Sequence, residues 1–319
     1  MDRPRGTRLL SQPNARTRVK HERPEGLPGG PGACSGNAVR ANLLSQDFDL
    51  VLESGAGSRQ YWRDLWLYRE LFYFLAWRDI LVRYKQTAIG VAWSVLRPLL
   101  TMAVLTLIFG KLARMPSEGD APYPILVFAA MLPWQMFANA LAESSNSLVA
   151  NANLLTKVYF PRLIVPASSI IVSLVDFGIS LAVFGLLAAW YGFAPTWRVL
   201  ALPAFLALAL VACSGFGLWL AALNVKYRDF RYIVPFIVQF GLYVSPVGFS
   251  SSIVPGNWRL LYSLNPMVGV IDGFRWALLG SRTGNCWSGF VLSAAVALLV
   301  FILAVGYFRR TERAFADFV

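Results

Sequence analysis

The sequence predicts an all-α membrane protein in which an amphipathic helix precedes six transmembrane helices. Two observations predict this class. Of the 319 residues, 56% are hydrophobic and only 14% are charged, whereas a soluble domain carries about 25% charged residues. Runs of ~20 apolar residues also recur along the chain, and each is long enough to cross ~30 Å of hydrocarbon.

The net charge of +12 would suit a nucleic-acid-binding protein, but the positions of the basic residues argue against that function. Many lie in the first 58 positions, and most of the others flank apolar runs. Basic residues placed in this way orient a protein in a membrane. We therefore expect the lipid bilayer as a partner of the chain, and no nucleic acid.

The sequence carries no recognisable catalytic, cofactor or metal site. Cys34, Cys213 and Cys286 are too few and too scattered for a disulfide framework or a zinc site, and His21 is the single histidine. The phosphate-binding loop Gly-x-x-x-x-Gly-Lys-[Ser/Thr] is absent, as is the hydrolase pattern Gly-x-Ser-x-Gly. We expect a transport subunit and not an enzyme, so that any ATPase is a separate chain.

Residues 1–58 form a block of their own, rich in Pro, Gly, Arg and Ser and without sustained periodicity. Such a segment cannot bury enough apolar surface to order itself. No apolar core of a signal peptide follows its charges. We predict a disordered cytosolic extension, and a tether for a partner is the alternative.

Residues 59–88 predict an amphipathic helix that is too charged to cross a membrane. The apolar positions at helical spacing are Leu65, Tyr68, Phe72 and Leu75. The polar end of the helix carries Arg78, Asp79, Arg83 and Tyr84. An ordinary soluble helix is the alternative, but the many aromatic residues and the span that follows favour the membrane surface.

The six predicted spans lie in residues 89–310, and a short cytosolic tail, residues 311–319, follows them. They begin at about residues 89, 123, 167, 199, 233 and 290, and the fifth loses its regularity at Ser245–Pro246. Between the fifth and sixth spans, residues 251–285 contain a second amphipathic piece. With the N-terminus inside, most Lys and Arg residues from Arg59 onward fall in inside segments, so we expect both termini in the cytosol.

Three charged residues fall within the predicted spans, namely Arg97, Glu143 and Asp176. Charges at bilayer depth are costly and usually pair or face the interior of the bundle. We expect a structural pair, with Arg97 as the basic partner. A proton relay is the alternative, but it lacks a histidine or a second acid at a similar depth.

Aromatic residues are abundant near the span ends, where tryptophans such as Trp134 are expected at the lipid–water interface. A different set lies on or just after the fifth span, at Phe236, Phe240, Tyr243 and Phe249. Some of these lie too deep for an interfacial belt. Packing against lipid and the lining of a channel both remain open for them.

The segment "LLTKVYFPR", residues 154–162, places apolar and basic residues together in a short loop between spans. A helix of this kind at a membrane surface suits docking into a groove on a partner. A tight turn without a partner is the alternative, although such a turn would not need "VYF" facing water.

Four stretches of the chain, which carry the membrane-surface helix and the loops, resemble one family. They are "WRDILVRYKQTAIGVAWSVLRPL" (77–99), "LLTKVYFPRLIVP" (154–166), "NVKYRDFRYIVP" (224–235) and "LNPMVGVIDGFRWALLG" (264–280). From about Tyr61 to Arg310 the chain resembles the membrane permease subunits of polysaccharide-exporting ABC transporters, the exporters of O-antigen, capsule and teichoic acid.

The resemblance implies a homodimer in the bacterial inner membrane, bound to cytosolic ABC ATPase subunits that hold the ATP. A lipid-linked polysaccharide would pass between the two copies. The amphipathic helix would be an interface helix, and short extracytoplasmic helices between spans five and six would shape the exit. The resemblance assigns ATPase coupling to Leu154, Lys157, Tyr159, Phe160, Arg162, Arg228 and Asp229. The resemblance assigns the glycan pathway to Phe236, Phe240, Tyr243, Phe249, Trp258 and Tyr262.

Three other functions compete with this one. An ABC exporter of the same fold could move a lipid or a drug. An ion-coupled carrier would need more acidic residues within the membrane and paired inverted repeats. An intramembrane enzyme would need clustered carboxylates or a metal site, and the sequence has neither.

Overall fold

A computed structural model of the chain describes residues 58–85, 90–116, 121–193, 196–280, 287–312 and residue 315. Every regular element in these residues is a helix, as predicted. The predicted extension, apart from its last residue, lies outside the described residues.

Five helical stretches are long and apolar enough to cross a membrane, which confirms a multi-pass membrane protein. They are formed by α4 (Gly90–Leu105) with the π-helical η1 (Thr106–Leu112), by α5 (Tyr123–Ala150), by α7 (Ile164–Trp190), by η2 (Trp197–Ala201) with α8 (Leu202–Lys226), and by α12 (Trp287–Thr311). Their apolar runs explain the agreement with the predicted spans, because the bilayer forces a long apolar segment to satisfy its backbone polar groups as a helix.

The predicted fifth span is shorter than the other five. It corresponds to α9 (Phe230–Val244), whose 15 residues extend about 22 Å. The helix ends where the sequence predicts, because Ser245 precedes Pro246 and adopts an extended conformation, with φ −82° and ψ 151°. A sixth crossing of the membrane therefore stays a prediction.

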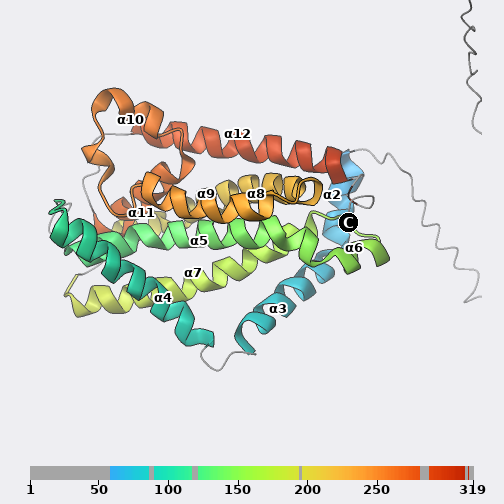
Figure 1. Cartoon of the computed structure of the whole chain (residues 1–319), viewed down its shortest axis with the longest axis horizontal. Helices are drawn as coiled ribbons and strands as arrows, with labels where there is room; N and C mark the ends of the chain where they lie inside the picture. The colour runs from blue at the N-terminus through green and yellow to red at the C-terminus, as the bar shows by residue number, and fades with distance from the viewer. Residues whose placement is uncertain are drawn as a thin grey trace, which may run out of the picture. The chain divides into compact units, whose positions relative to one another are not determined.

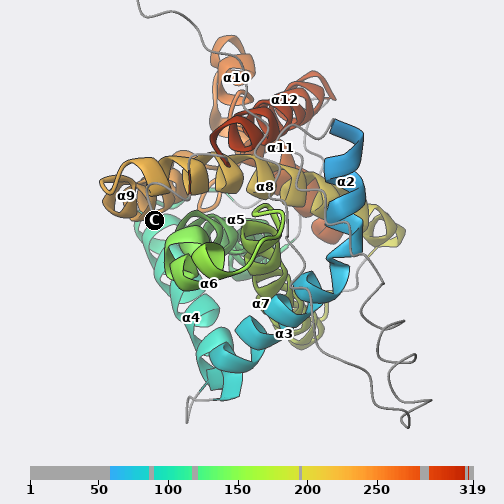
Figure 2. The same cartoon turned by 90° about the vertical axis from the view of Figure 1, so that its right-hand side faces the viewer.

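Helix α5 is the central element of the bundle. It packs against α4, α7, α8, α9 and α11, and Figure 2 shows it surrounded by neighbouring helices. The Trp134 side chain is buried in the middle of α5, so its predicted interfacial position is wrong. Its ring packs directly on α9 at Gly241, where a Cβ atom would lie 2.6 Å from the Trp134 ring. Only a glycine permits this approach.

The second amphipathic piece of the sequence forms a helix that is mostly buried. After η3 (Ser251–Ile253) and α10 (Gly256–Tyr262), the chain forms α11 (Pro266–Leu279), which packs against α5, α8 and α12. The fully buried Arg275 guanidinium donates hydrogen bonds to the carbonyl oxygens of Phe249 (2.9 Å) and Val247 (3.1 Å). This cation therefore serves the turn after α9 and does not face water.

The predicted amphipathic helix is divided in two at Tyr68, into α2 (Ser58–Leu67) and α3 (Arg69–Lys85). Figure 1 shows α2, the short helix α6 (Ala152–Lys157) and the C-terminal end of α12 gathered at one end of the bundle, which we call the α6 end. The opposite end carries α10, and we call it the α10 end.

A second apolar core lies at the α6 end, and we call it the end core. Its buried members are Leu75, Leu148, Leu155, Phe160, Leu163, Ile164, Val165, Leu218, Ala221, Ala222, Val225, Ala304, Phe308 and Phe315. The predicted apolar positions Leu65, Tyr68 and Phe72 pack against this core, and Leu75 belongs to it. The predicted apolar face of the amphipathic segment is thus confirmed, although it covers protein.

Candidate functional site

The loop between α5 and α7 is a compact turn at the α6 end, and we call residues 151–163 the α6 turn. Asn151 ends α5, and its carbonyl oxygen accepts the backbone N–H groups of Leu154 (3.0 Å) and Leu155 (3.1 Å), which starts α6. Val158 then adopts an extended conformation and ends the helix. The chain therefore reverses direction within a few residues.

The apolar side chains of the α6 turn point in two directions. Leu155 and Phe160 belong to the end core, and Phe160 is only 4% exposed. Tyr159 is 73% exposed and Val158 is about half exposed. The prediction that Phe160 contacts a partner is therefore wrong, because its ring packs inside the chain. Val158 and Tyr159 form the accessible tip of the turn.

Arg162 makes contacts within the chain that the sequence does not predict. Its backbone N–H donates to the Glu312 carboxylate (2.7 Å), and its guanidinium donates to the Glu312 carbonyl oxygen. Glu312 directly follows α12. These contacts hold Arg162 within the chain, while its predicted contact with an ATPase stays a prediction.

The first corner of the α6 turn is held by α3. The Arg78 guanidinium donates to the Asn151 side-chain oxygen (2.9 Å) and forms an ion pair with the neighbouring Asp79 (2.7 Å). Asn151 in turn donates to the carbonyl oxygen of Ser147 in α5 (2.9 Å). The α6 turn is thus fixed at Asn151 by α3 and at Arg162 by the segment after α12.

The acidic residues predicted within the spans meet Arg83 of α3 and not Arg97. Arg83 lies 2.8 Å from the Asp176 carboxylate and 3.3 Å from that of Glu143. The Arg97 side chain is exposed on α4, so the predicted pair with Arg97 is wrong. Because Arg83 and Asp176 are 93 positions apart in the chain, the spacing of the sequence could not reveal their contact.

Tyr84 adds a hydrogen bond to this cluster, because its hydroxyl donates to the Asp176 carboxylate. Burial, together with the Asp176 acceptor, raises the pKa of Tyr84 to about 12. The phenol therefore keeps its proton at physiological pH and remains a donor. Arg83 and Tyr84 together compensate the cost of placing the Asp176 carboxylate among helices.

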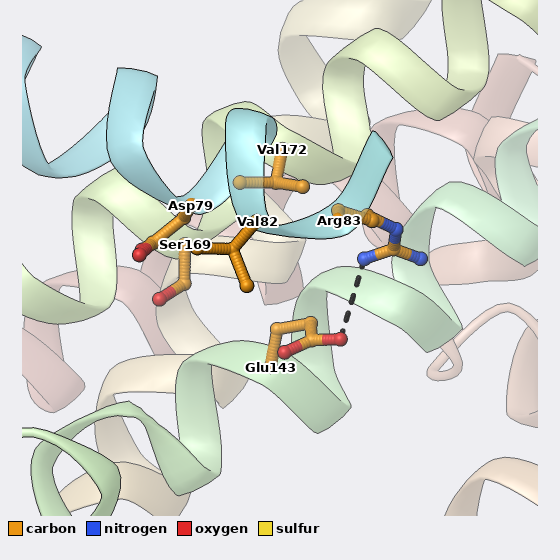
Figure 3. Close-up of a pocket in the computed structure, with 6 residues that line it drawn as sticks. All are labelled: Asp79, Val82, Arg83, Glu143, Ser169 and Val172. Atoms are coloured by element: carbon orange, nitrogen blue, oxygen red, sulfur yellow. Dashed lines mark hydrogen bonds and ion pairs between the residues drawn. The ribbon is translucent and has the colours of Figure 1, made fainter. Parts of the chain in front are cut away.

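A cavity of about 310 Å³ lies beside this cluster, between α3, α5 and α7. Its lining residues are Asp79, Val82, Arg83, Glu143, Ser169 and Val172. Figure 3 shows the Arg83 guanidinium directed at Glu143 along one wall. The carboxylates of Glu143 and Asp176 neutralise the charge of Arg83, and Asp79 adds a third carboxylate. The cavity therefore does not present a net positive charge to a ligand.

The segment that carries Arg228 and Asp229, which the resemblance assigns to ATPase coupling, lies between α8 and α9. Arg228 and Asp229 are exposed there, as is Lys157 on α6. The end of α8 reaches the same end core as the α6 turn through Val225. Exposed charges and the apolar tip therefore share one end of the bundle.

The aromatic residues predicted for a glycan pathway divide into two groups. Phe236, Phe240 and Tyr243 are exposed on one face of α9, where the Phe236 and Phe240 rings stack with centroids 5.9 Å apart. Trp258 on α10 is also exposed. Phe249 and Tyr262 are half-buried, and the Tyr262 hydroxyl donates to the Val244 carbonyl oxygen (2.8 Å), which fixes the end of α9.

Taken together, the fold defines a helical multi-pass membrane protein with an anchored turn, exposed at its tip, at one end. Residues 70–279 match the family described as ABC-2 type transporter, and the chain belongs to this family. It is 29% identical to the O-antigen export system permease protein RfbA of Myxococcus xanthus over an alignment of 257 residues. The alignment covers 80% of this chain and 97% of that protein.

Two further relatives are O-antigen export system permease proteins RfbA from Klebsiella pneumoniae. Both are 24% identical to this chain. One aligns over 242 residues, 75% of this chain and 91% of its own length. The other aligns over 200 residues, 62% of this chain and 76% of its own length.

Sequence reasoning missed three residues of the site, namely Asn151, Glu312 and Phe315. Glu312 lies in the segment that the sequence describes only as a tail. A signal was present, because an acidic and an aromatic residue follow the basic pair Arg309–Arg310 at helical spacing. That pattern does not identify Arg162 as the partner.

The Arg83 cluster leads to a test of stability. Arg83→Ala leaves the largely buried Asp176 carboxylate without its cation, which costs about 3 kcal/mol. The double variant Arg83→Ala with Asp176→Asn removes the unpaired charge and recovers part of this loss. Thermal unfolding in detergent measures both. Arg97→Ala is the control and should change the midpoint little; an effect of Arg97→Ala as large as that of Arg83→Ala would contradict the pairing.

Proposed function

We propose that the chain is the membrane permease subunit of an ATP-driven exporter that moves lipid-linked polysaccharide across the bacterial inner membrane. It would act with a second copy of itself and with cytosolic ABC ATPase subunits, and it binds no cofactor of its own. Membership of the ABC-2 type transporter family supports a transport role. The polysaccharide is favoured by the relatives, which are named as O-antigen export permeases.

The α6 end would face the cytosol. It carries Lys157 on α6, Arg228 between α8 and α9, Arg231 in the first turn of α9, and the pair Arg309–Arg310 at the end of α12. Basic residues concentrate on the cytoplasmic side of membrane proteins. In this proposed orientation the ATPase would bind at the α6 turn and the α10 end would lie outside.

The main support for the coupling role is the exposure of Tyr159. This side chain is 73% exposed, and it lies on a turn that is fixed at both of its ends. Tyr159 and the neighbouring Val158 form a contiguous exposed apolar surface, which is a feature of protein-contact sites. Exposed tyrosines at interfaces frequently contribute much of the binding energy. A fixed turn also transmits a displacement to α5 and α7, because it cannot absorb the movement by bending.

The exposed face of α9 would contribute to the glycan pathway. Stacked rings such as Phe236 and Phe240 offer flat apolar surfaces on which the apolar faces of sugars can pack. An exporter of the same fold for a lipid or a drug is the alternative. The two differ in what a cell accumulates when the permease is missing.

The coupling role can be tested with two neighbouring residues. Tyr159→Ala removes only the exposed contact, so it should leave insertion and unfolding unchanged but weaken binding of the ATPase about tenfold or more. Phe160→Ala opens a cavity in the end core and should lower stability by about 3 kcal/mol.

Binding of the purified ATPase and thermal unfolding distinguish these effects. Tyr191→Ala, at the exposed C-terminal end of α7, is the matched control and should change neither. Unchanged ATPase binding by Tyr159→Ala would count against the proposed docking.

The substrate can be tested by deletion and complementation. A strain without this chain should accumulate lipid-linked polymer in the cytosol, and the wild-type chain should restore export. The double variant Phe236→Ala with Phe240→Ala should insert normally, since both rings are exposed, but should restore export poorly.

The matched control is Ile302→Ala with Leu303→Ala, two equally exposed residues on α12. It should restore export fully. A deletion strain that exports polymer normally would reject the polysaccharide as the substrate and leave the lipid or drug exporter.

A further inference from the structure

The segment directly after α12 joins three elements at the α6 end. One oxygen of the Glu312 carboxylate accepts the backbone N–H of Arg162 (2.7 Å), and the other accepts the Tyr61 hydroxyl of α2 (3.0 Å). The Glu312 carbonyl oxygen accepts the Arg162 guanidinium. A single residue thus links α2 and the end of the α6 turn to α12.

Aromatic packing strengthens this junction. The Phe315 ring, which is 1% exposed, packs edge-on against Phe308 of α12 with centroids 5.4 Å apart. The Arg162 guanidinium lies 5.9 Å from the centre of the Phe315 ring. The Arg309 guanidinium lies 4.7 Å from the centre of the Tyr61 ring. Both contacts have the geometry of cation–π interactions.

The Glu312 carboxylate is well suited to hold a position. Burial raises its pKa, while the Arg162 N–H, the Tyr61 hydroxyl and the nearby arginines act in the opposite direction. Hydrogen bonds to an ionised carboxylate are shorter and stronger than those between neutral groups. Loss of the carboxylate would leave the partly buried Arg162 N–H without its acceptor, which is more costly than loss of an exposed contact.

This junction lies close to the exposed tip of the α6 turn. Arg162 lies three residues after the exposed Tyr159, and Phe160 between them is buried in the end core. The other end of the α6 turn is held by Arg78. Without Glu312, the Arg162 side of the turn would be held by the packing of Phe160 and Leu163 alone and would move more readily relative to α7.

We propose that Glu312 and Phe315 form a clasp by which the segment after α12 fixes the α6 turn, with Glu312 as a positioning residue for the coupling of ATP hydrolysis to export. This role rests on the proposed function. An ordinary helix-end contact would contribute to stability alone, whereas the clasp predicts an effect on the ratio of export to ATP hydrolysis.

The experiment uses the full-length chain with its ATPase in proteoliposomes, and it measures ATP hydrolysis, export of lipid-linked polysaccharide, and amide hydrogen exchange of residues 152–163. Glu312→Ala should reduce protection of these amides on the order of tenfold or more, since two hydrogen bonds to a carboxylate are lost. Export per ATP hydrolysed should fall while hydrolysis continues.

Two variants cover the case in which Glu312→Ala fails to assemble. Glu312→Gln keeps an acceptor for the Arg162 N–H and should retain most of the coupling. Tyr61→Phe removes only the hydroxyl and should give a partial loss. Thr311→Ala is the matched control, because the Thr311 hydroxyl bonds to the Tyr307 carbonyl oxygen within α12 (2.9 Å).

The outcomes separate the clasp from the proposed function. Unchanged exchange in Glu312→Ala and Tyr61→Phe overturns the clasp, and so does faster exchange with an unchanged export ratio. A wild-type chain that exports no polysaccharide rejects the proposed function, while the exchange result still reports whether the clasp exists. Faster exchange together with a lower export ratio, absent in Thr311→Ala, supports the proposal.

Discussion

The burial of Phe160 beside the Arg162–Glu312 contact is the constraint on which the α6 turn depends. Val158 and Tyr159 are exposed only because the next residue is anchored in the end core and Arg162 is bound to the segment after α12. The same core collects the ends of α5, α8 and α12, so the turn is part of the bundle and not an appendage. A turn built in this way can pass a displacement at its tip to the membrane helices.

The bilayer explains the remaining arrangement. Long apolar helices satisfy their own backbone groups, and the central α5 is covered on most sides. The buried charged groups Asp176 and Arg275 are compensated by neighbouring segments. Arg83 meets Asp176 and Glu143, and Arg275 meets the carbonyl oxygens of the turn after α9. Each of these contacts joins segments that are distant in the sequence, so each restricts how the helices move relative to one another.

The sequence predicts the features of the fold that depend on short segments of the chain. The long apolar runs locate α5, α7, α8 and α12 to within a few residues, and Ser245–Pro246 locates the end of α9, because hydrophobic length and proline geometry are properties of short segments. The exposure of Tyr159 also follows from its place in a polar loop. The partners of Arg83 and Arg162, the burial of Phe160 and α11, and the interior position of Trp134 depend on which helices become neighbours. No spacing in the sequence encodes that choice.

The central claim is that the exposed tip of the α6 turn is covered by the ATPase. The most direct measurement is the rate of thiol labelling of Tyr159→Cys, in a chain whose Cys34, Cys213 and Cys286 are replaced by alanine, with and without the bound ATPase. A cysteine at the exposed Trp258, on the α10 end, serves as the reference. The account predicts that binding of the ATPase slows labelling at position 159 and leaves position 258 unchanged. Equal labelling of position 159 in the free and bound states would contradict it.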